Sequence, residues 1–437
     1  MIELYHMLDI NFIRENRGLV ADAIHNKGYD IDLSELLKLD EERKSLGQKI
    51  DELRQERNEI SAKMKNGKPE QVLVERGKGI KVELAKFEEE MSQVEKKYIT
   101  LLKLVPNVPS DDVPVGLTED ENVVDEIVGE PTKFAFAPKN HYEIGVARGW
   151  IDKERAAKVV GSRFAYIMGD MVKLQMAIVN FVIASLSDEK VIEEIVKKNK
   201  LDVSTKAFTP VLPPLMIRTE MYDAMDRLEP SEDRYKIEGE ELWLQGSAEH
   251  VLGSMHAGEI FEEKDMPVRY LGYATSFRQE AGTYGKDMEG IIRMHQFDKL
   301  EMESFSTKET SRAEHELMVA IQRWLLEKLE LPYRVIKKCT FDIGKPDARG
   351  IDMEVWLPGQ DKYRETHTAD YMTDYQSRRL NTRVRTKDAI ELVHTNDATA
   401  FALGRIMIAI IENYQNEDMT VRVPEVLKPF INGKECI

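Results

Sequence analysis

Cysteine is nearly absent from this chain of 437 residues. Its two cysteines, Cys339 and Cys436, form no CxxC pair and have no histidine at ligand spacing. A disulfide framework is therefore excluded and no zinc site is indicated, which suits a protein of the reducing cytoplasm. Hydrophobic residues make up 42% and charged residues 32% of the chain, the composition of a soluble globular protein with two or three domains.

Long apolar runs and an excess of positive charge are missing as well. The most apolar window, residues 171–186, contains Lys173, Gln175 and Asn180 and is too short and polar to span a bilayer. The first residues lack the basic and apolar regions of a signal peptide, so we expect no membrane partner. The net charge of −17 is unfavourable for nonspecific nucleic-acid binding. We expect no DNA partner, and an RNA contact only through a local basic surface.

Two seams of apolar residues with alternating spacings of three and four run through the N-terminal part of the chain. The first consists of Leu36, Leu39, Leu46, Ile50, Leu53, Ile60 and Met64, with Arg43 and Arg57 at the two missing positions. The second consists of Ile80, Leu84, Phe87, Met91, Val94, Tyr98, Leu101 and Val105. Gly and Pro within residues 65–69 favour a turn between them. We predict an antiparallel coiled coil of two helices, each roughly 40 Å long at 1.5 Å per residue.

The turn of this predicted hairpin is basic. From Leu36 to Leu104 there are 16 lysines and arginines against 14 acidic residues. Near the turn, only Glu70 and Glu75 oppose a group of cations made of Lys63, Lys65, Lys68, Arg76, Lys78 and Lys81. Such a patch attracts phosphate groups and predicts salt-dependent RNA binding. A dimerisation coiled coil with solvated charges is the alternative.

Residues 270–303 have the pattern of a β-hairpin with a glycine-rich turn. If the strands continue to the turn, Arg278 and Glu280 share one face, as do the return-strand residues Arg293, His295, Phe297, Lys299 and Glu301. Guanidinium groups suit phosphate oxygens, a ring suits stacking on a base, and carboxylates suit an amine. The hairpin fits a nucleotide together with an amine-bearing small molecule. A solvated hairpin with cross-strand ion pairs is the alternative.

Residues 277–280 (FRQE), residues 292–297 (IRMHQF) and Glu301 resemble motif 2 of the class II aminoacyl-tRNA synthetases, in its seryl-tRNA synthetase form. Residues 208–222, with Pro214, resemble motif 1. Residues 394–399, followed by a predicted helix over 400–415, resemble motif 3. The resemblance implies an α+β protein. Residues 1–107 would form a tRNA-binding domain with the coiled-coil arm, and residues 108–437 a catalytic domain with an antiparallel sheet flanked by helices, entered through a linker over about 108–135.

The function implied by this resemblance is ATP-dependent activation of serine and its transfer to the 3′ end of tRNA(Ser), with tRNA(Sec) as a second possible acceptor. ATP is a substrate, Mg²⁺ accompanies it, zinc is not expected, and motif 1 implies a homodimer. Two alternatives remain. One is a related ligase that loads a small amino acid onto a carrier protein, and the other is an inactive homologue that binds RNA.

The resemblance also implies the site residues. Those for ATP are Arg278, Glu280, Arg293, Met294, Phe297, Glu365, Thr366, His367, Thr368 and Arg405. Those for serine are Ser247, Ala248, Glu249, Arg278, Glu301, Asp397 and Thr399. Arg278, Arg405 and Glu365 are the catalytic group, and Glu365 is a Mg²⁺ ligand at the ATP phosphates because hard oxygen atoms suit that ion. The bland alternatives are a helix cap for Ser247 and Glu249, and an exposed edge-strand position for Glu365.

The sequence departs from the family pattern near the serine pocket. Residues 365–371 read ETHTADY where bacterial members commonly have EISSCSN, and Asp397 stands where Asn is common. The family's glycine-rich segment after motif 1 is not found within residues 218–244, and residues 187–207 hold an additional charged helical stretch. His367, Asp370 and Asp397 therefore either form a compensating cluster or alter the choice of amino acid.

Overall fold

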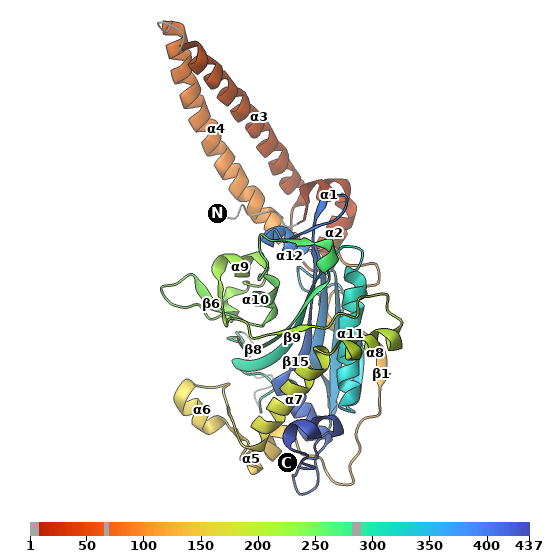
Figure 1. The fold of residues 1–437 in the computed structure, drawn as a ribbon. Helices are drawn as coiled ribbons and strands as arrows, with labels where there is room; N and C mark the ends of the chain where they lie inside the picture. The colour runs from red at the N-terminus through yellow and green to blue at the C-terminus, as the bar shows by residue number, and fades with distance from the viewer. Residues whose placement is uncertain (1–7, 65–69, 282–289) are drawn as a thin grey trace. The chain divides into compact units, whose positions relative to one another are not determined.

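The computed structural model describes residues 8–64, 70–281 and 290–437 (Figure 1). These residues divide into two compact units, an N-terminal unit that ends at Val108 and a second unit from Pro109 to Ile437. Each has its own hydrophobic contacts, so each is described separately.

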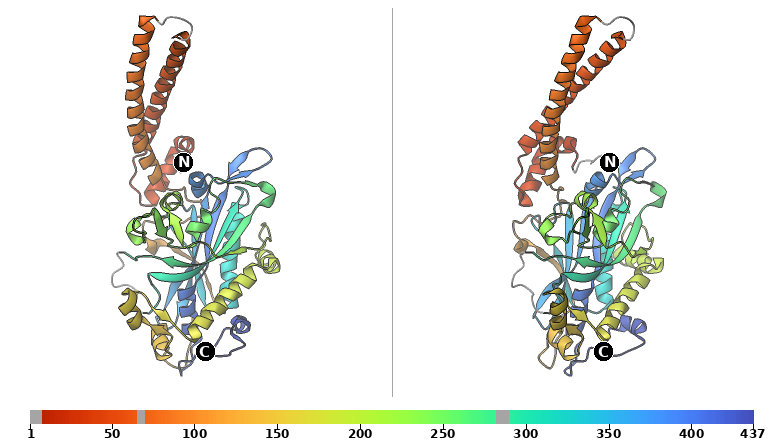
Figure 2. Two further views of the ribbon diagram at one scale, coloured as in Figure 1. Left: turned by 60° about the vertical axis from the view of Figure 1, so that its left-hand side comes forward. Right: turned by 90° about the vertical axis from the view of Figure 1, so that its left-hand side faces the viewer.

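The N-terminal unit is helical. Two short helices, α1 (Ile10–Glu15) and α2 (Arg17–Asn26), precede two long helices, α3 (Leu33–Met64) and α4 (Gln71–Leu104), which run side by side (Figure 2). The predicted seams pack together, with Ile50, Leu53, Ile60, Ile80 and Leu84 buried in one cluster. The predicted arm is confirmed, but its helices of 32 and 34 residues are about 50 Å long at 1.5 Å per residue, longer than expected.

Arg43 shows why a coiled-coil seam tolerates a cation. Its guanidinium carbon lies 4.6 Å from the centre of the Tyr98 ring, and it is 3.3 Å from the carboxylate of Asp40, which is fully buried. Burial acts to raise the pKa of Asp40, but its hydrogen bonds to Lys44, Arg14 and Arg43 outweigh burial and lower it. Arg57, the other polar seam residue, is exposed.

The second unit is built on a mixed eight-stranded sheet of described residues, in the order β1-β10-β11-β12-β15-β9-β8-β4. All neighbours are antiparallel except β4 and β8, which are parallel. The strands are β1 (Val123–Val128), β4 (Thr209–Val211), β8 (Val268–Phe277), β9 (Gln296–Ser306), β10 (Tyr333–Lys337), β11 (Arg349–Leu357), β12 (Lys362–Thr373) and β15 (His394–Ala402). The predicted α+β class with an antiparallel sheet is confirmed.

Long helices pack against one face of this sheet. They are α7 (Asp170–Leu186), α11 (Ser311–Lys328) and α13 (Leu403–Asn413), and their apolar side chains share one core with the sheet (Figure 1). On β9, Leu300 and Met302 belong to this core. Because side chains alternate along a strand, Lys299, Glu301 and Glu303 point to the opposite face.

Smaller elements complete the unit. The charged stretch predicted within residues 187–207 is helix α8 (Glu189–Asn199), and further helices are α5 (His141–Ala147), α6 (Lys153–Val160), α9 (Thr219–Ala224), α10 (Glu249–Gly253) and α12 (Tyr375–Leu380). Short strands pair outside the main sheet, namely β2 (Ile151–Asp152), β3 (Tyr166–Ile167), β5 (Met216–Arg218), β6 (Leu242–Leu244), β7 (Ile260–Glu262), β13 (Arg383–Arg385) and β14 (Ile390–Leu392). The helix predicted from Ala400 begins at Leu403, because β15 continues to Ala402.

Over the described ranges, no single helix is both long and apolar enough to cross a membrane. Only helices α7 and α8 taken together, with a bend of 75° at the break between them, have the length and composition to do so.

Candidate active site

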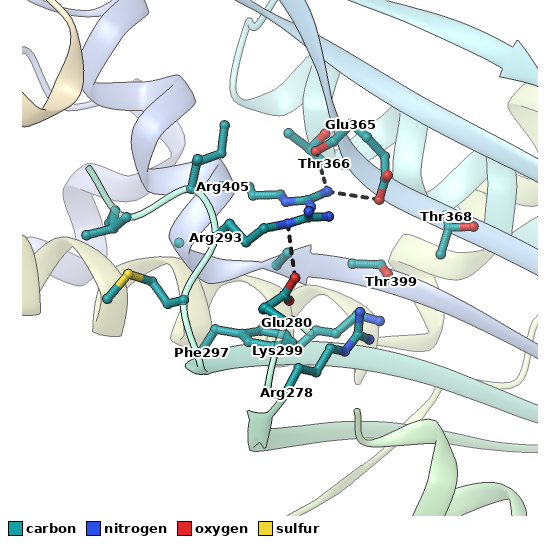
Figure 3. A pocket seen from close by; sticks show the side chains of 15 residues that line it. Arg278, Glu280, Arg293, Phe297, Lys299, Glu365, Thr366, Thr368, Thr399 and Arg405 are labelled. Carbon is teal, nitrogen blue, oxygen red and sulfur yellow. Dashed lines mark hydrogen bonds and ion pairs between the residues drawn. The ribbon is translucent and has the colours of Figure 1, made fainter. Parts of the chain in front are cut away.

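One pocket brings together residues from several parts of the second unit (Figure 3). The residues that follow β8, the segment that leads into β9 and the start of β9 form one side, and β12, β15 and the start of α13 form the other. The lining residues are Arg278, Glu280, Ile291, Ile292, Arg293, Met294, Phe297, Lys299, Glu365, Thr366, Thr368, Thr399, Ala402, Gly404 and Arg405. Nine of the ten residues predicted for ATP are therefore in one place, with His367 as the exception.

The hairpin of motif 2 is shorter than the alternation predicted. Strand β8 ends at Phe277 and β9 begins at Gln296, and Glu280 has a φ of 52°, which is not a strand conformation. His295, predicted on the same face as Arg293 and Phe297, does not line the pocket, and its ring lies 5.2 Å from the ring of Phe164. The glycine-rich turn falls largely in residues 282–289, outside the described residues.

Three guanidinium groups line the pocket. Arg293 Nε is 3.1 Å from Glu280 Oε2, and Arg405 Nη1 donates to both the carbonyl and the carboxylate of Glu365 at 2.9 Å (Figure 3). Arg278 Nε donates to the carbonyl of Gly246 at 3.0 Å, and its guanidinium carbon lies 5.4 Å from the centre of the Phe297 ring. Three such cations around one cavity fit the phosphate groups of a nucleotide.

Glu365 lies where β12 is paired on one side only. Its register partner is Glu354 of β11, whereas the pairing of β12 with β15 begins at Ala369, so Glu365 is an exposed residue with an open strand edge, as the edge-strand alternative has it. Desolvation acts to raise the pKa of Glu365, but Arg405 and Lys338 outweigh it and the net shift is downward. An ionised carboxylate facing the pocket fits a Mg²⁺ ligand. Within the described ranges, no group of three His, Cys, Asp or Glu residues is placed to hold a metal ion.

The residues predicted for serine surround Lys299. Its Nζ atom is 2.5 Å from Glu301 Oε2 and 3.9 Å from Glu249 Oε2, and it donates to Ser247 Oγ at 3.1 Å. All four side chains are buried. The helix-cap alternative is not seen, because Ala248 is the cap residue of α10 and no side chain caps that helix. The arrangement supplies carboxylates and a hydroxyl for a small polar substrate.

The two carboxyl groups beside Lys299 differ in their pKa. Burial acts to raise the pKa of Glu249, but Lys299, His250 and Arg227 hold it well below its usual value. Burial raises the pKa of Glu301 to about 8 despite the attraction of Lys299. Glu249 is therefore ionised at neutral pH while Glu301 carries a proton for most of the time.

The structure separates the residues that depart from the family pattern. His367 lies on the face of β12 that holds Ala369, its ring is 5.2 Å from the Phe401 ring, and burial lowers its pKa to about 3. Asp370 and Asp397 face each other across β12 and β15. Neither lines the pocket. Asp397 is also 3.5 Å from Arg227, so the two aspartates form a cluster with a cation and His367 has no part in it.

The residues predicted to bind tRNA lie in the N-terminal unit. Lys63, Lys78 and Lys81 are exposed on α3 and α4. Arg76 is engaged by two carboxylates, at 2.6 Å from Glu56 and 2.8 Å from Glu83. Lys65 and Lys68 are outside the described residues.

Sequence reasoning left several pocket residues without a role. Lys299 was on the predicted strand face, and the alternation with Phe297 and Glu301 was the signal that could have placed it in the site. Ile292 belonged to the segment that resembles motif 2 but was given no role, and Ile291, Ala402 and Gly404, which also line the pocket, were not predicted for it. Arg227 was also missed, because its partners are far away in sequence.

Comparison with known proteins gives matches over the whole chain. The model of the seryl-tRNA synthetase N-terminal domain matches residues 7–109, and that of the tRNA synthetase class II core domain (G, H, P, S and T) matches residues 233–414. A serine–tRNA ligase of Thermodesulfovibrio yellowstonii is 38% identical, over 97% of this chain and 99% of that protein. One of Thermotoga neapolitana is 40% identical, over 99% of this chain and 100% of that protein. The crystal structure of seryl-tRNA synthetase from Pyrococcus horikoshii complexed with ATP is 37% identical with a TM-score of 0.86, over 99% of both chains.

The sheet, the pocket and the matched core domain are those of a class II aminoacyl-tRNA synthetase. Within this class, the proteins that match nearly the full length of the chain are seryl-tRNA synthetases. The chain belongs to the seryl-tRNA synthetase family. The resemblance in the sequence is thereby confirmed, and neither the carrier-protein ligase nor the inactive homologue is favoured.

Proposed function

We propose that this chain activates L-serine with ATP and transfers the seryl group to the 3′ end of tRNA(Ser). The observation that carries the proposal is one pocket, in a seryl-tRNA synthetase chain, that gathers the residues Arg278, Glu280, Arg293, Phe297, Glu365 and Arg405. The relative from Pyrococcus horikoshii is complexed with ATP, which supports ATP as the nucleotide. Charging of tRNA(Sec) is a second possibility.

The ATP end of the pocket would work through position and charge. Phe297 and Glu280 would hold the adenine, by stacking and by hydrogen bonding. Arg278 would bind the α-phosphate together with the serine carboxylate, and Arg293 and Arg405 would bind the outer phosphates. Met294, Thr366 and Thr368 would complete the walls.

The serine end would be read by Ser247, Glu249, Glu301 and Thr399, with Ala248 between the first two. Ionised Glu249 suits the substrate ammonium, and the carboxyl of Glu301 suits its hydroxyl. A site that hydrogen-bonds the substrate hydroxyl can reject alanine, while threonine must be excluded by shape.

The reaction needs no nucleophile from the protein. A serine carboxylate oxygen attacks the α-phosphorus of ATP, the bond to the β-phosphate bridging oxygen breaks, and pyrophosphate leaves. A ribose hydroxyl of tRNA then attacks the seryl carbonyl and AMP leaves. Arg278 and Arg405 would neutralise charge that develops on the phosphate oxygens, which is the main contribution of such sites.

Magnesium would neutralise phosphate charge when it accompanies ATP, and Glu365 is the residue that would hold it. We also propose a homodimer through the segment that resembles motif 1, where Leu212, Leu215 and Met216 are exposed apolar side chains. Sedimentation as a stable monomer would contradict the dimer. A cytoplasmic location stays a prediction of the sequence.

Amino-acid-dependent exchange of pyrophosphate into ATP tests the proposed function. Wild-type protein should exchange with serine and only weakly with threonine, alanine, glycine or cysteine. Arg278→Ala should lower the serine-dependent rate by about 10²-fold or more, the usual effect of removing a donor that neutralises transition-state charge. Arg385→Ala is the matched control, because Arg385 is an exposed arginine outside the pocket and outside the segment that resembles motif 1. Exchange with none of these amino acids would contradict the proposal.

A further inference from the structure

The strand register defines how the amino-acid end of the pocket is built. Glu301 of β9 is the register partner of Thr399 of β15. Thr368 of β12 lies on the same face and, like Thr399, lines the pocket (Figure 3). These three residues, the pocket row, come from three adjacent strands.

A second row of side chains lies two residues further along the same strands. We call this second row the acidic row. It consists of Glu303 of β9, Asp397 of β15 and Asp370 of β12, and register pairs join Glu303 to Asp397 and Asp397 to Asp370. Their exposed fractions are 0%, 2% and 7%, so water does not screen them. Like charges directly opposite each other on a sheet are unfavourable, and this row places two such pairs side by side.

Arg227 compensates part of this charge. It follows α9, and its Nη2 atom is 3.5 Å from Asp397 Oδ2 and 3.3 Å from Asp347 Oδ1. Glu303 has no such partner, because neither of its carboxylate oxygens has a hydrogen-bond partner within the described residues. One guanidinium thus stands against several buried carboxyl groups.

The protonation of the row reflects the same imbalance. Burial, with the neighbouring carboxylates, raises the pKa of Asp397 and of Glu303 well above their usual values, and burial raises that of Asp370 to about 6. The charged groups that face the row are Arg227, Lys338, Lys299, Asp347, Glu249 and Glu301. An added cation near this row would favour the ionised carboxylates and would be attracted by them.

We propose that Arg227 is a specificity-determining residue, because it offsets the acidic row and thereby lets the pocket reject an amino acid with an amine in place of the serine hydroxyl. The acidic row lies about 7 Å from the pocket row, two residues along a strand, which is within reach of Coulomb attraction in a buried site. The inference rests on the proposed serine activation. It adds that Arg227 keeps amino acids with a second amine from competing with serine.

The test measures pyrophosphate exchange by full-length protein with serine, alanine and 2,3-diaminopropionate, which carries an amine where serine has its hydroxyl. Arg227→Met should raise the ratio of kcat/KM for diaminopropionate to that for serine by about tenfold, the equivalent of one buried charge interaction of 1.4 kcal/mol. Arg227→Lys keeps the charge and should keep the ratio. Arg379→Met is the matched control, because Arg379 is a buried arginine paired with Asp223 and Asp226 and not with the acidic row.

Removal of a carboxylate should act in the opposite direction. Asp397→Asn and Glu303→Gln preserve the shape of the side chains and should lower the ratio of kcat/KM for diaminopropionate to that for serine. These two variants test the inference if Arg227→Met does not fold. If these variants leave the ratio unchanged, the inference is contradicted and the proposed serine activation is not. The same holds if Arg227→Met raises kcat/KM for alanine relative to serine as much as it does for diaminopropionate, because the pocket would then have lost selectivity in general. Wild-type protein that exchanges with no amino acid contradicts the proposed function and the inference with it.

Discussion

Lys299 is the residue that holds the amino-acid end of the pocket together. It is buried and touches Glu301 at 2.5 Å and Ser247 at 3.1 Å, with Glu249 at 3.9 Å. These partners come from β9 and from the start of α10, so one ammonium group connects two separate elements. Buried carboxylates need such a cation, because an uncompensated buried charge is costly.

Loss of the Lys299 charge should destabilise the protein. We expect Lys299→Met to lower the free energy of unfolding by about 3–5 kcal/mol, since it leaves buried carboxylates without their cation. Urea unfolding followed by fluorescence measures the change. The double variant Lys299→Met with Glu249→Gln should recover part of the loss, because Glu249 is the ionised partner, and a double variant no more stable than the single one would contradict this account.

Glu301 should make stability depend on pH. Its pKa rises from the usual 4.5 to about 8 on folding, so the folded state binds this proton more tightly than the unfolded state. Its contribution to stability is therefore complete below about pH 4.5 and is lost as pH rises through about 8. Glu301→Gln removes this loss, and its stability relative to wild type should increase between pH 5 and pH 9 in urea unfolding. Parallel pH profiles would contradict the assignment.

At the scale of elements, α5 and α13 fix the segment that enters β9. His141, the first residue of α5, accepts a hydrogen bond from the Ile291 N–H at Nε2, 3.3 Å away. Its Nδ1 atom is 2.9 Å from the carboxylate of Glu412 in α13, which also accepts from the backbone N–H groups of His141 and Gly359 at 3.0 Å. Ile291 lines the pocket, so these contacts determine one wall of the proposed nucleotide site.

Gly290 has no room for a side chain beside this contact. A β-carbon there would overlap the imidazole of His141, and its φ of 69° disfavours other residues. Overlap of this kind costs about 1–3 kcal/mol, so we expect Gly290→Ala to raise the KM for ATP roughly tenfold in pyrophosphate exchange. Gly258→Ala is the matched control, because its φ is 81° but no atom lies within 4 Å of the added carbon. Equal effects of the two substitutions would mean that backbone strain alone is responsible.

At the scale of the whole molecule, the proposed sites of adenylate formation and of tRNA binding fall in different units. The candidate pocket lies entirely within the unit from Pro109 to Ile437, whereas the exposed lysines of α3 and α4 belong to the N-terminal unit. The protein carries a net charge of −17, so its tRNA must be attracted by a local basic surface.

Charge reversal on the arm should separate the two activities. Lys63→Glu with Lys78→Glu and Lys81→Glu should lower kcat/KM for tRNA in aminoacylation by about tenfold or more and weaken its salt dependence, since phosphate contacts release counterions. Serine-dependent pyrophosphate exchange without tRNA should stay unchanged. The same triple change at Lys38, Lys96 and Lys97, exposed positions toward the other end of the arm helices, should have a smaller effect on tRNA. Equal losses would argue against recognition near the turn.

Much of the fold could be predicted because its signals are local. The seams of α3 and α4 follow a helical period, and the alternation of Phe297, Lys299 and Glu301 follows a strand period, so each can be read within a few residues. The strand boundaries were less accurate. Arg278 and Arg293 lie beyond β8 and before β9, where the positive φ of Glu280 and the contact of Ile291 with His141 set the backbone.

By itself, the sequence determined the arm, the class of fold and the family, and it predicted most of the residues that line the pocket, because these depend on spacing along the chain. Tertiary structure alone placed His367 away from the pocket, brought Arg405 to Glu365, and joined Arg227 to Asp397 across 170 positions. It also decided the protonation of Glu301 and of the acidic row. Burial and the distance between charges set those pKa values, and both are properties of the folded chain.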